Sequence, residues 1–279
     1  MSLARELDVA LDLARQCGVI ALDLQRRGPS ALATRDKGDG EGPVTRADTE
    51  LNARLVAALE AAFPGDTIVA EESAAAGEAA RRRARRCWFI DPIDGTSEYA
   101  RGEDEWAIHI GLCVDGEPAL GVVHEPARAR LSWGTCLDEH VAWGEAAGGR
   151  ARRLHTAATP PGALRLVSSK SHASPKILEV MGALGIPPER NLRIGSTGVK
   201  MMTIAWGEAD LYVHPRAGTK LWDTGAPHAI LKAAGGAVSD LRGDPLRYRG
   251  AGIGNDAGVL AVGGHHQAIA SRLRHLADA

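Results

Sequence analysis

The chain has 279 residues, of which 44% are hydrophobic and 24% charged, and its formal net charge is -2 at pH 7. This balance is typical of a globular protein with one large domain or two modest ones, and it argues against a nucleic-acid polymer as partner. No apolar run approaches the roughly 20 residues that span a bilayer, and we expect no signal peptide. The four cysteines lack metal-finger spacing, and we interpret them as reduced thiols. We therefore expect a cytoplasmic protein.

The first part of the chain predicts two helices. Apolar residues recur at helical spacing from Leu3 to Leu22 and stop before Gly28-Pro29. After a glycine-rich loop at 37–43, Thr45 to Asp48 has the form of a capping box. It predicts the start of a second helix, whose apolar face runs from Leu51 to Phe63.

Two short strands, Thr67 to Ala70 and Trp88 to Ile90, lead directly into the acidic residues Glu71 and Asp91. Active sites of sheet proteins commonly lie at the C-terminal ends of strands, so we expect these acids to face a site. The arginine-rich run 81–86 between the strands reads as a solvated turn, and a phosphate-attracting rim is the alternative.

A hairpin is predicted next. Alternating apolar residues from Ile108 to Val114 precede Asp115-Gly116, a strong two-residue turn signal, and then the strand Leu120 to Val123. His109 lies within the first of these strands, and we interpret it as a sheet histidine without a catalytic role. Strand-like runs continue to about Trp143.

The stretch from Gly148 to Gly162 is polar and contains Gly and Pro, which makes it the candidate domain boundary. Beyond it, strands and helices are predicted to alternate, with strands at Leu164 to Val167 and Ala209 to Val213 and helices at Pro175 to Leu184, Val199 to Trp206 and about Asp223 to Ala234. We expect Asp223 to be the N-cap of the last helix, which ends at Gly235-Gly236.

The string Asp91-Pro92-Ile93-Asp94-Gly95-Thr96 carries most of the chemical information. Two carboxylates this close at the end of a buried strand repel each other unless a cation neutralises them. Gly95 permits close backbone approach to a ligand, Thr96 adds a hydroxyl, and a helix turn beginning there would point free N–H groups at an anion. Oxygen ligands of this kind favour magnesium or manganese over zinc. Taken alone, the string also fits a hydrogen-bonded structural turn.

Glu71-Glu72 upstream and Trp222-Asp223 far downstream complete a pattern that resembles the inositol-monophosphatase-like superfamily of lithium-sensitive, magnesium-dependent phosphatases. The resemblance runs from about Asp48 to Tyr248. It implies an α/β fold, the layered αβαβα sandwich. Residues 1–155 would form an α+β half that carries the metal site, and residues 156–279 an α/β half that carries substrate recognition and Asp223.

The resemblance also implies two or three Mg2+ ions per site, and Mn2+ accepts the same oxygen ligands. By this resemblance, a first ion would be held by Glu71, Asp91 and the backbone carbonyl of Ile93. A second would be held by Asp91, Asp94 and Asp223, and Glu72 would lie near a third, weaker site. Such ions would neutralise the attacking and leaving oxygens of an in-line displacement.

For catalysis, the resemblance pairs Thr96 with Asp48 to position and deprotonate the attacking water, and it adds Glu71 to the catalytic set. The site residues would thus come from the early helix, from the strand end at Asp91 and from the distant Asp223.

Three features resemble the 3'(2'),5'-bisphosphate nucleotidases within the superfamily. The catalytic loop continues as Thr96-Ser97-Glu98-Tyr99, the segments 169–172 and 195–200 are similar to those that hold AMP, and the stretch between Tyr212 and Trp222 contains bases but no acid. The implied substrate-binding residues are Gly95, Thr96, Ser171, His172, Ser196, Lys200, His214 and Arg216. Alternatively, Ser171 and His172 would only cap a helix and the basic loop would turn to solvent.

The expected reaction is hydrolysis of the 3'-phosphate of 3'-phosphoadenosine 5'-phosphate, or of its phosphosulfate, giving AMP or adenosine 5'-phosphosulfate. The resemblance implies a role in clearing the by-product of sulfur assimilation. The alternatives are an inositol monophosphatase or broad sugar-phosphate phosphatase, and, in another class, an inactive metal- or nucleotide-binding regulator. The expected partner is a small phosphate ester, and a homodimer stays open.

Overall fold

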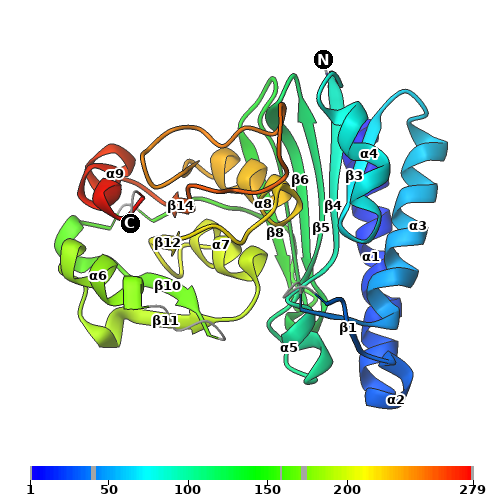
Figure 1. Ribbon diagram of the computed structural model, residues 1–279, viewed down its shortest axis with the longest axis horizontal. Coiled ribbons are helices and arrows are strands. Elements are labelled where there is room, and N and C mark those ends of the chain that lie inside the picture. The colour runs from blue at the N-terminus through cyan, green and yellow to red at the C-terminus, as the bar shows by residue number, and fades with distance from the viewer. Residues whose placement is uncertain (1, 39–41, 158, 171–174, 278–279) are drawn as a thin grey trace.

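The structure is a computed structural model that describes residues 2–38, 42–157, 159–170 and 175–277. Helices and sheets stack in five alternating layers, which confirms the predicted αβαβα sandwich (Figure 1). Three hydrophobic clusters fill the spaces between the layers. Among the described residues, none of the helices has both the length and the apolar character needed to cross a membrane.

The first sheet has seven strands in the order β3-β4-β5-β6-β7-β8-β9, and only the β3–β4 pair is parallel. The predicted hairpin is confirmed, since Asp115 and Gly116 both have positive φ, at 53° and 86°, between β5 and β6. The strands are β3 Thr67–Ala70, β4 Arg86–Asp94, β5 Ala107–Val114, β6 Glu117–Glu125, β7 Arg130–Thr135, β8 Val141–Ala146 and β9 Arg152–Arg153.

Two long helices cover the outer face of this sheet, α1 Ala4–Arg26 and α3 Arg46–Ala62 (Figure 1). The capping box is confirmed, because Thr45 caps α3 and the Asp48 carboxylate accepts the Thr45 N–H at 2.8 Å. The shorter elements of this half are α2 Pro29–Leu32, β1 Arg35–Asp36, β2 Pro43–Val44, α4 Ala74–Arg81 and α5 Thr96–Ala100.

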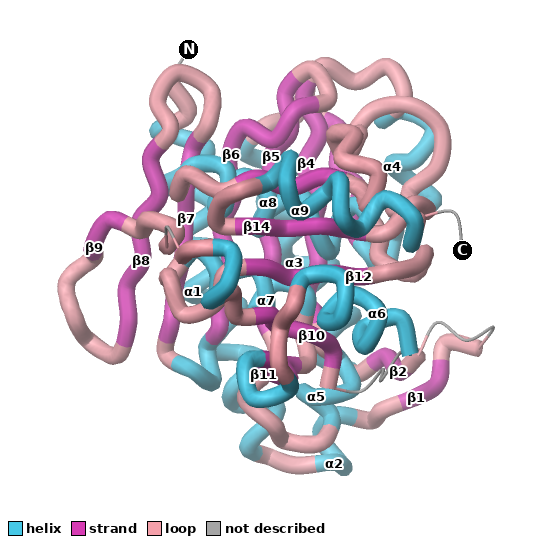
Figure 2. The backbone as a smooth tube through the Cα atoms, turned by 90° about the vertical axis from the view of Figure 1, so that its left-hand side faces the viewer, coloured by secondary structure: helices cyan, strands magenta, loops and turns pink. Residues whose placement is uncertain are grey.

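The second sheet has five strands in the order β11-β10-β12-β14-β13, and α6 and α9 lie over its outer face (Figure 2). Strand β10 is parallel to β11 and β12, whereas β14 is antiparallel to its neighbours. The elements are β10 Leu166–Ser169, α6 Pro175–Leu184, β11 Asn191–Ile194, β12 Leu211–His214, β13 Ala237–Ser239, β14 Val259–Val262 and α9 His266–Leu273.

Between the sheets lie α7 Thr197–Ala205 and α8 Leu221–Ala233. Helix α8 packs closely on the first sheet because a Cβ at Gly111 or Gly121 would come within 2.6 Å or 2.1 Å of the Ala226 backbone. Since this middle layer packs against both sheets, the division into 1–155 and 156–279 stays a prediction.

Some local expectations were wrong. Asp223 is not the N-cap of α8 but its third residue; Lys220 is the N-cap, and Asp223 Oδ2 accepts the Lys220 N–H at 2.8 Å. Helix α7 begins at Thr197 rather than Val199, because the Ser196 hydroxyl caps it by accepting the Val199 N–H at 3.0 Å.

The arginine-rich run is only partly the solvated turn that the sequence predicts. Arg82, Arg83 and Arg85 are exposed, but Arg81 is buried. Its guanidinium donates to the carbonyls of Tyr248, at 3.1 Å, and of residues 250 and 252. Composition could not single out Arg81, because its acceptors are more than a hundred residues away in the chain.

Candidate active site

A β-bulge in β4 brings the two aspartates of the central string to one face of the sheet. Asp91 pairs with His109 of β5 and Asp94 with Ala107, so three steps along β4 match two along β5. In a regular strand, residues three apart point to opposite faces, and one extra residue restores the same face. Asp91 and Asp94 therefore both face the middle layer, and both are buried.

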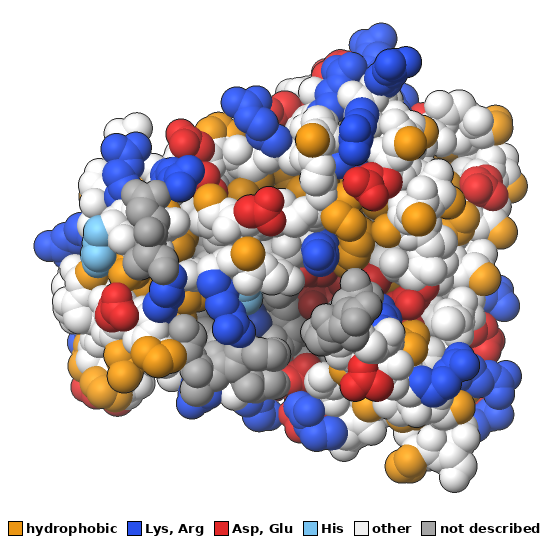
Figure 3. Space-filling view, in the orientation of Figure 1, with side chains coloured by type: hydrophobic (Ala, Val, Ile, Leu, Met, Phe, Trp, Pro, Cys, Tyr) orange, Lys and Arg blue, Asp and Glu red, His pale blue; other side chains and the backbone are white. Residues whose placement is uncertain are grey.

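Four carboxylates lie close enough to affect one another. Burial raises the pKa of Asp91 well above its ordinary value, and the charges of Glu71, Asp94 and Asp223 raise it further. The pKa of Asp223 is also raised by burial and by Asp94 and Glu71. On the face shown in Figure 3, acidic side chains are recessed near the centre, with Lys and Arg side chains around them. An all-oxygen cluster with this mutual repulsion suits a hard divalent cation.

The carboxylates are turned toward protein donors. Among the residues that the structure describes, no group of three or more His, Cys, Asp and Glu side chains forms a ready coordination shell. Ile93, whose carbonyl was predicted as a ligand, accepts there from Thr96 Oγ1 at 3.0 Å, and its N–H donates to Asp91 Oδ1 at 3.1 Å. The donor set fits Mg2+ or Mn2+ in chemistry, and ligation requires reorientation of these side chains.

Lys37 supplies a positive charge that sequence reasoning missed. Its Nζ lies 2.7 Å from Glu71 Oε1 and 2.5 Å from Glu72 Oε1. Burial acts to lower the pKa of Lys37, but the two carboxylates outweigh it and raise that pKa. The only sequence signal was a lysine beside the glycine-rich loop, and only the fold shows that it reaches these acids.

Asp94 is held by the N-terminus of α7. Its Oδ2 accepts from the Ser196 hydroxyl and from the Gly198 N–H at 2.5 Å, and its Oδ1 accepts the Thr197 N–H at 3.2 Å. Burial acts to raise the pKa of Asp94, but His109 and these hydrogen bonds outweigh it and hold the pKa at about 2. Ser196, predicted to bind substrate, thus contacts a predicted metal ligand in this arrangement.

The predicted pair of Thr96 and Asp48 is present. Thr96 Oγ1 lies 3.1 Å from Asp48 Oδ1, and Asp48 Oδ2 accepts from the Thr45 hydroxyl at 2.6 Å. Burial raises the pKa of Asp48 to about 6, against the hydrogen bonds from Thr45 and with help from the charges of Glu71 and Glu72. This arrangement can accept a proton through the Thr96 hydroxyl near neutral pH.

Gly95 is required by the backbone at the start of α5. Its φ is +91°, and a Cβ there would come within 2.9 Å of the Glu105 carbonyl oxygen and 3.1 Å of Ser196 Cβ. Protein atoms thus approach the Gly95 backbone closely, and the approach of a ligand there stays a prediction.

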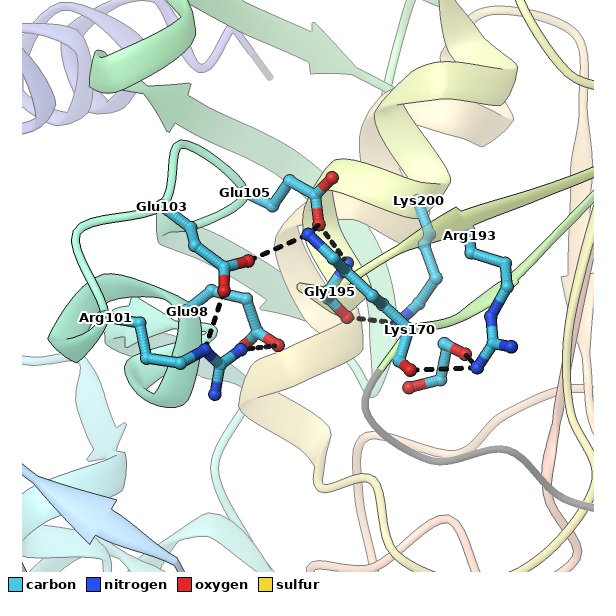
Figure 4. A network of polar contacts seen from close by, with 9 residues as sticks. Glu98, Arg101, Glu103, Glu105, Lys170, Arg193, Gly195 and Lys200 are labelled. Carbon is cyan, nitrogen blue, oxygen red and sulfur yellow. Dashed lines mark hydrogen bonds and ion pairs between the residues drawn. The ribbon is translucent and has the colours of Figure 1, made fainter.

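Beside this loop, a polar network joins residues 103–105 to the segments that follow β10 and β11 (Figure 4). Lys170, at the end of β10, lies 2.9 Å from Glu103 Oε2 and 3.4 Å from Glu105 Oε2. Glu105 Oε2 also accepts the Gly195 N–H at 2.9 Å. The sequence indicated Lys170 only as part of the segment 169–172 and indicated neither acid, because the partners of Glu103 and Glu105 lie far away in the chain.

The remaining predicted substrate residues lie in different surroundings. Lys200 is buried, its Nζ donates to the Gly195 carbonyl at 2.5 Å and lies 5.1 Å from the Tyr212 ring centroid, and burial lowers its pKa to about 8. His214 ends β12 and is partly buried, whereas Arg216 is exposed. The expectations for Ser171 and His172 fall outside the described residues.

Comparison with known proteins places these residues in a family. Residues 3–277 match the inositol monophosphatase family. The chain is 34% identical over 243 residues to the 3'(2'),5'-bisphosphate nucleotidase CysQ of Escherichia coli strain K12, covering 87% of this chain and 93% of the relative. It is 35% identical over 207 residues to a 3'-phosphoadenosine 5'-phosphate phosphatase of Mycobacterium bovis, covering 72% and 70%.

Solved structures agree with the fold. An inositol monophosphatase from Zymomonas mobilis superposes with a TM-score of 0.72 at 28% identity, covering 97% of this chain and 98% of that one. CysQ from Bacteroides thetaiotaomicron has the same fold, with a TM-score of 0.72 at 24% identity over 91% of this chain and 95% of that one. The chain therefore belongs to the inositol monophosphatase family and is a phosphatase.

Proposed function

We propose that this phosphatase is a magnesium-dependent 3'(2'),5'-bisphosphate nucleotidase. It hydrolyses the 3'-phosphate of 3'-phosphoadenosine 5'-phosphate, or of its phosphosulfate, to AMP or adenosine 5'-phosphosulfate. The observation that carries the phosphatase chemistry is the contact of Thr96 with Asp48 beside the buried carboxylates of Asp91 and Asp94. The substrate is supported by the relatives named for this activity in Escherichia coli and Mycobacterium bovis.

The proposed ligands of Mg2+ are Glu71, Asp91, the carbonyl of Ile93, Asp94 and Asp223. When bound, the ions increase the acidity of water and neutralise charge that develops on the phosphoryl oxygens. Mn2+ suits the same oxygen ligands, and a third ion would lie near Glu72.

The protein's own steps begin with the dyad. The Thr96 hydroxyl accepts a proton from the attacking water as it donates its own to Asp48 Oδ1, and Glu71 helps to orient the water. The N-terminus of α5 directs N–H groups of Gly95 and Thr96 at the phosphate. Because Asp48 is buried and its pKa is about 6, it is ionised at neutral pH and accepts a proton readily.

Substrate selection is assigned to the second half. Between Tyr212 and Trp222 the chain has His214, Arg216 and Lys220 and no acid, a set that favours a second phosphate over inositol hydroxyls. We include Ser196 and Lys200 in the substrate pocket on family resemblance, together with Ser171 and His172. Ser196 donates to Asp94 and Lys200 donates to the Gly195 carbonyl, so each of the two would exchange this partner for the substrate when it binds.

A phosphate-release assay over four substrates tests the proposal. With Mg2+, the bisphosphonucleotide should give the highest kcat/KM among itself, inositol 1-phosphate, fructose 1,6-bisphosphate and histidinol phosphate, and Li+ should inhibit. Turnover without added divalent metal after chelation would contradict the metal assignment. Higher kcat/KM for inositol 1-phosphate would contradict the substrate.

An inositol or sugar-phosphate phosphatase is the second candidate, supported by the fold shared with the Zymomonas mobilis inositol monophosphatase at 28% identity. We further propose a cytoplasmic enzyme that removes a by-product of sulfur assimilation. Size measurement in solution would test whether it is a homodimer.

A further inference from the structure

His109 occupies a position at which the two halves of the site meet. It lies in the middle of β5, directly opposite Asp91, and its side chain has no exposed area. Residues directly opposite in antiparallel strands share a face, so the imidazole points with Asp91 into the middle layer.

The two ring nitrogens of His109 lie near oxygens that belong to different site segments. Nε2 lies 3.3 Å from Asp94 Oδ2 and makes no hydrogen bond among the described residues, and Nδ1 lies 3.4 Å from the Trp222 carbonyl oxygen. Asp94 and Asp223, the neighbour of Trp222, are both proposed ligands of the same ion. One side chain therefore spans the segments that carry two ligands from opposite halves.

The opposing helix is shaped to receive this ring. A Cβ at Gly198, in the first turn of α7, would come within 1.9 Å of His109 Nε2, so only glycine leaves room for the imidazole. The Gly198 N–H also donates to Asp94 Oδ2. Ring, glycine and carboxylate thus form one contact between the first sheet and the N-terminus of α7.

We propose that His109 is a positioning residue for the metal site. Its ring lies against Asp94 on the Nε2 side and against the start of α8, with Asp223, on the Nδ1 side, and so sets the spacing between the two ligands. The inference rests on the proposed function, since it assumes that these aspartates ligate Mg2+. Groups that orient ligands in this way typically change metal affinity on the order of 10- to 100-fold when they are removed.

Three substitutions separate the two contacts from simple filling of space. His109→Gln keeps an amide donor near the place of Nε2, His109→Asn keeps one near the place of Nδ1, and His109→Leu keeps bulk without either donor. Mn2+ binding to the protein alone is measured by isothermal titration calorimetry, so the readout does not depend on turnover.

We expect His109→Leu to weaken Mn2+ binding by on the order of 10-fold or more, and His109→Gln to restore most of it. His109→Asn should lie between them, because only the indirect contact through Trp222 remains. KM for substrate should change less than Mn2+ affinity, since the His109 ring has no exposed area. Ile110→Ala, on the other face of β5, is the control: it should lower Tm and leave Mn2+ affinity unchanged.

Gly198→Ala supplies an independent test, because the added methyl must displace the ring. It should weaken Mn2+ binding in the wild-type background and have little further effect in His109→Leu. An equal loss of Mn2+ affinity in His109→Gln and His109→Leu, or wild-type affinity in His109→Leu, would overturn the role of His109 and leave the metal site standing. Failure of the wild-type protein to bind Mn2+ would overturn the metal site itself, and the inference with it.

Discussion

Asp48 Oδ1 and Thr96 Oγ1 lie 3.1 Å apart, although 48 positions separate the residues in the chain. Asp48 comes from the first turn of α3 and Thr96 from the first turn of α5, so the contact joins the outer helical layer to the strand end at the carboxylate cluster. It places a proton acceptor next to the hydroxyl that would contact the attacking water.

Replacing this hydroxyl should remove a proton-transfer step. Thr96→Val and Asp48→Asn should each lower kcat by about 10² to 10⁴, while KM stays within a few-fold. Phosphate-release kinetics with saturating Mg2+ measure this, and Thr49→Val, an exposed threonine on α3, is the matched control. A Thr96→Val enzyme with half the wild-type kcat would exclude the dyad.

Each proposed metal ligand should be indispensable. Asp223→Asn removes a ligand charge but can still accept the Lys220 N–H through its amide oxygen, so turnover should be lost while the circular dichroism spectrum is kept. Asp94→Asn should also abolish turnover, and it should lower Tm more, because the Asp94 carboxylate accepts from three groups around the start of α7. An active Asp94→Asn enzyme would contradict the assignment.

The second phosphate should depend on the basic residues of the second half. Arg216→Ala and Lys200→Ala should raise KM for the bisphosphonucleotide far more than KM for inositol 1-phosphate. Lys200 is buried, so its loss should also lower Tm, whereas loss of the exposed Arg216 should not. Equal effects on both substrates would argue against the nucleotide.

Glu125 should make stability depend on pH. Burial raises its pKa from 4.5 to about 7, with Arg128 and Arg130 opposing, and its Oε1 has no hydrogen-bond partner among the described residues. Between these two values the folded protein keeps a proton that the unfolded chain has lost, so the Glu125 contribution to stability falls as pH rises through this window. Above the folded-state pKa it stays at the lower level.

Glu125→Gln should abolish that fall. Relative to wild type, its free energy of unfolding should rise by up to about 3 kcal/mol between pH 5 and pH 8. Urea unfolding at the two pH values measures the difference, with Glu145→Gln, whose side chain is 39% exposed, as control. If the free energies of unfolding of Glu125→Gln and wild type differ by the same amount at pH 5 and pH 8, Glu125 is ionised in the folded protein throughout this range.

Arg81 and Arg82 are neighbours whose replacement should change stability by very different amounts. Arg81→Met should lower the free energy of unfolding by about 3 kcal/mol, because the buried guanidinium is lost and three carbonyls of the 248–252 loop lose their donor. Arg82→Met, at an exposed position, should change it by less than about 0.5 kcal/mol. Chemical denaturation of both variants tests the pair, and equal effects would contradict the role of Arg81.

Much of the local structure could be predicted, because local patterns decide it. The capping box at Thr45, the hairpin at Asp115-Gly116 and the helix Pro175–Leu184 depend on neighbours within a few residues. The N-cap of α8 was missed because Asp is a favoured N-cap residue and Lys is not, so local preference pointed to Asp223. In the fold, Asp223 is instead the third residue of the helix and accepts the Lys220 N–H from inside it.

By itself, the sequence determined the strands that end in acids, the family and the set of carboxylates around Asp91, Asp94 and Asp223, since these lie in short continuous motifs. The tertiary structure alone decided which partners those acids have. Lys37 reaches Glu71, α7 holds Asp94, and His109 faces Asp94 and the Trp222 carbonyl. Such contacts depend on strand register, on the bulge in β4 and on how closely α7 and α8 pack on the sheet, and none of these follows from local spacing.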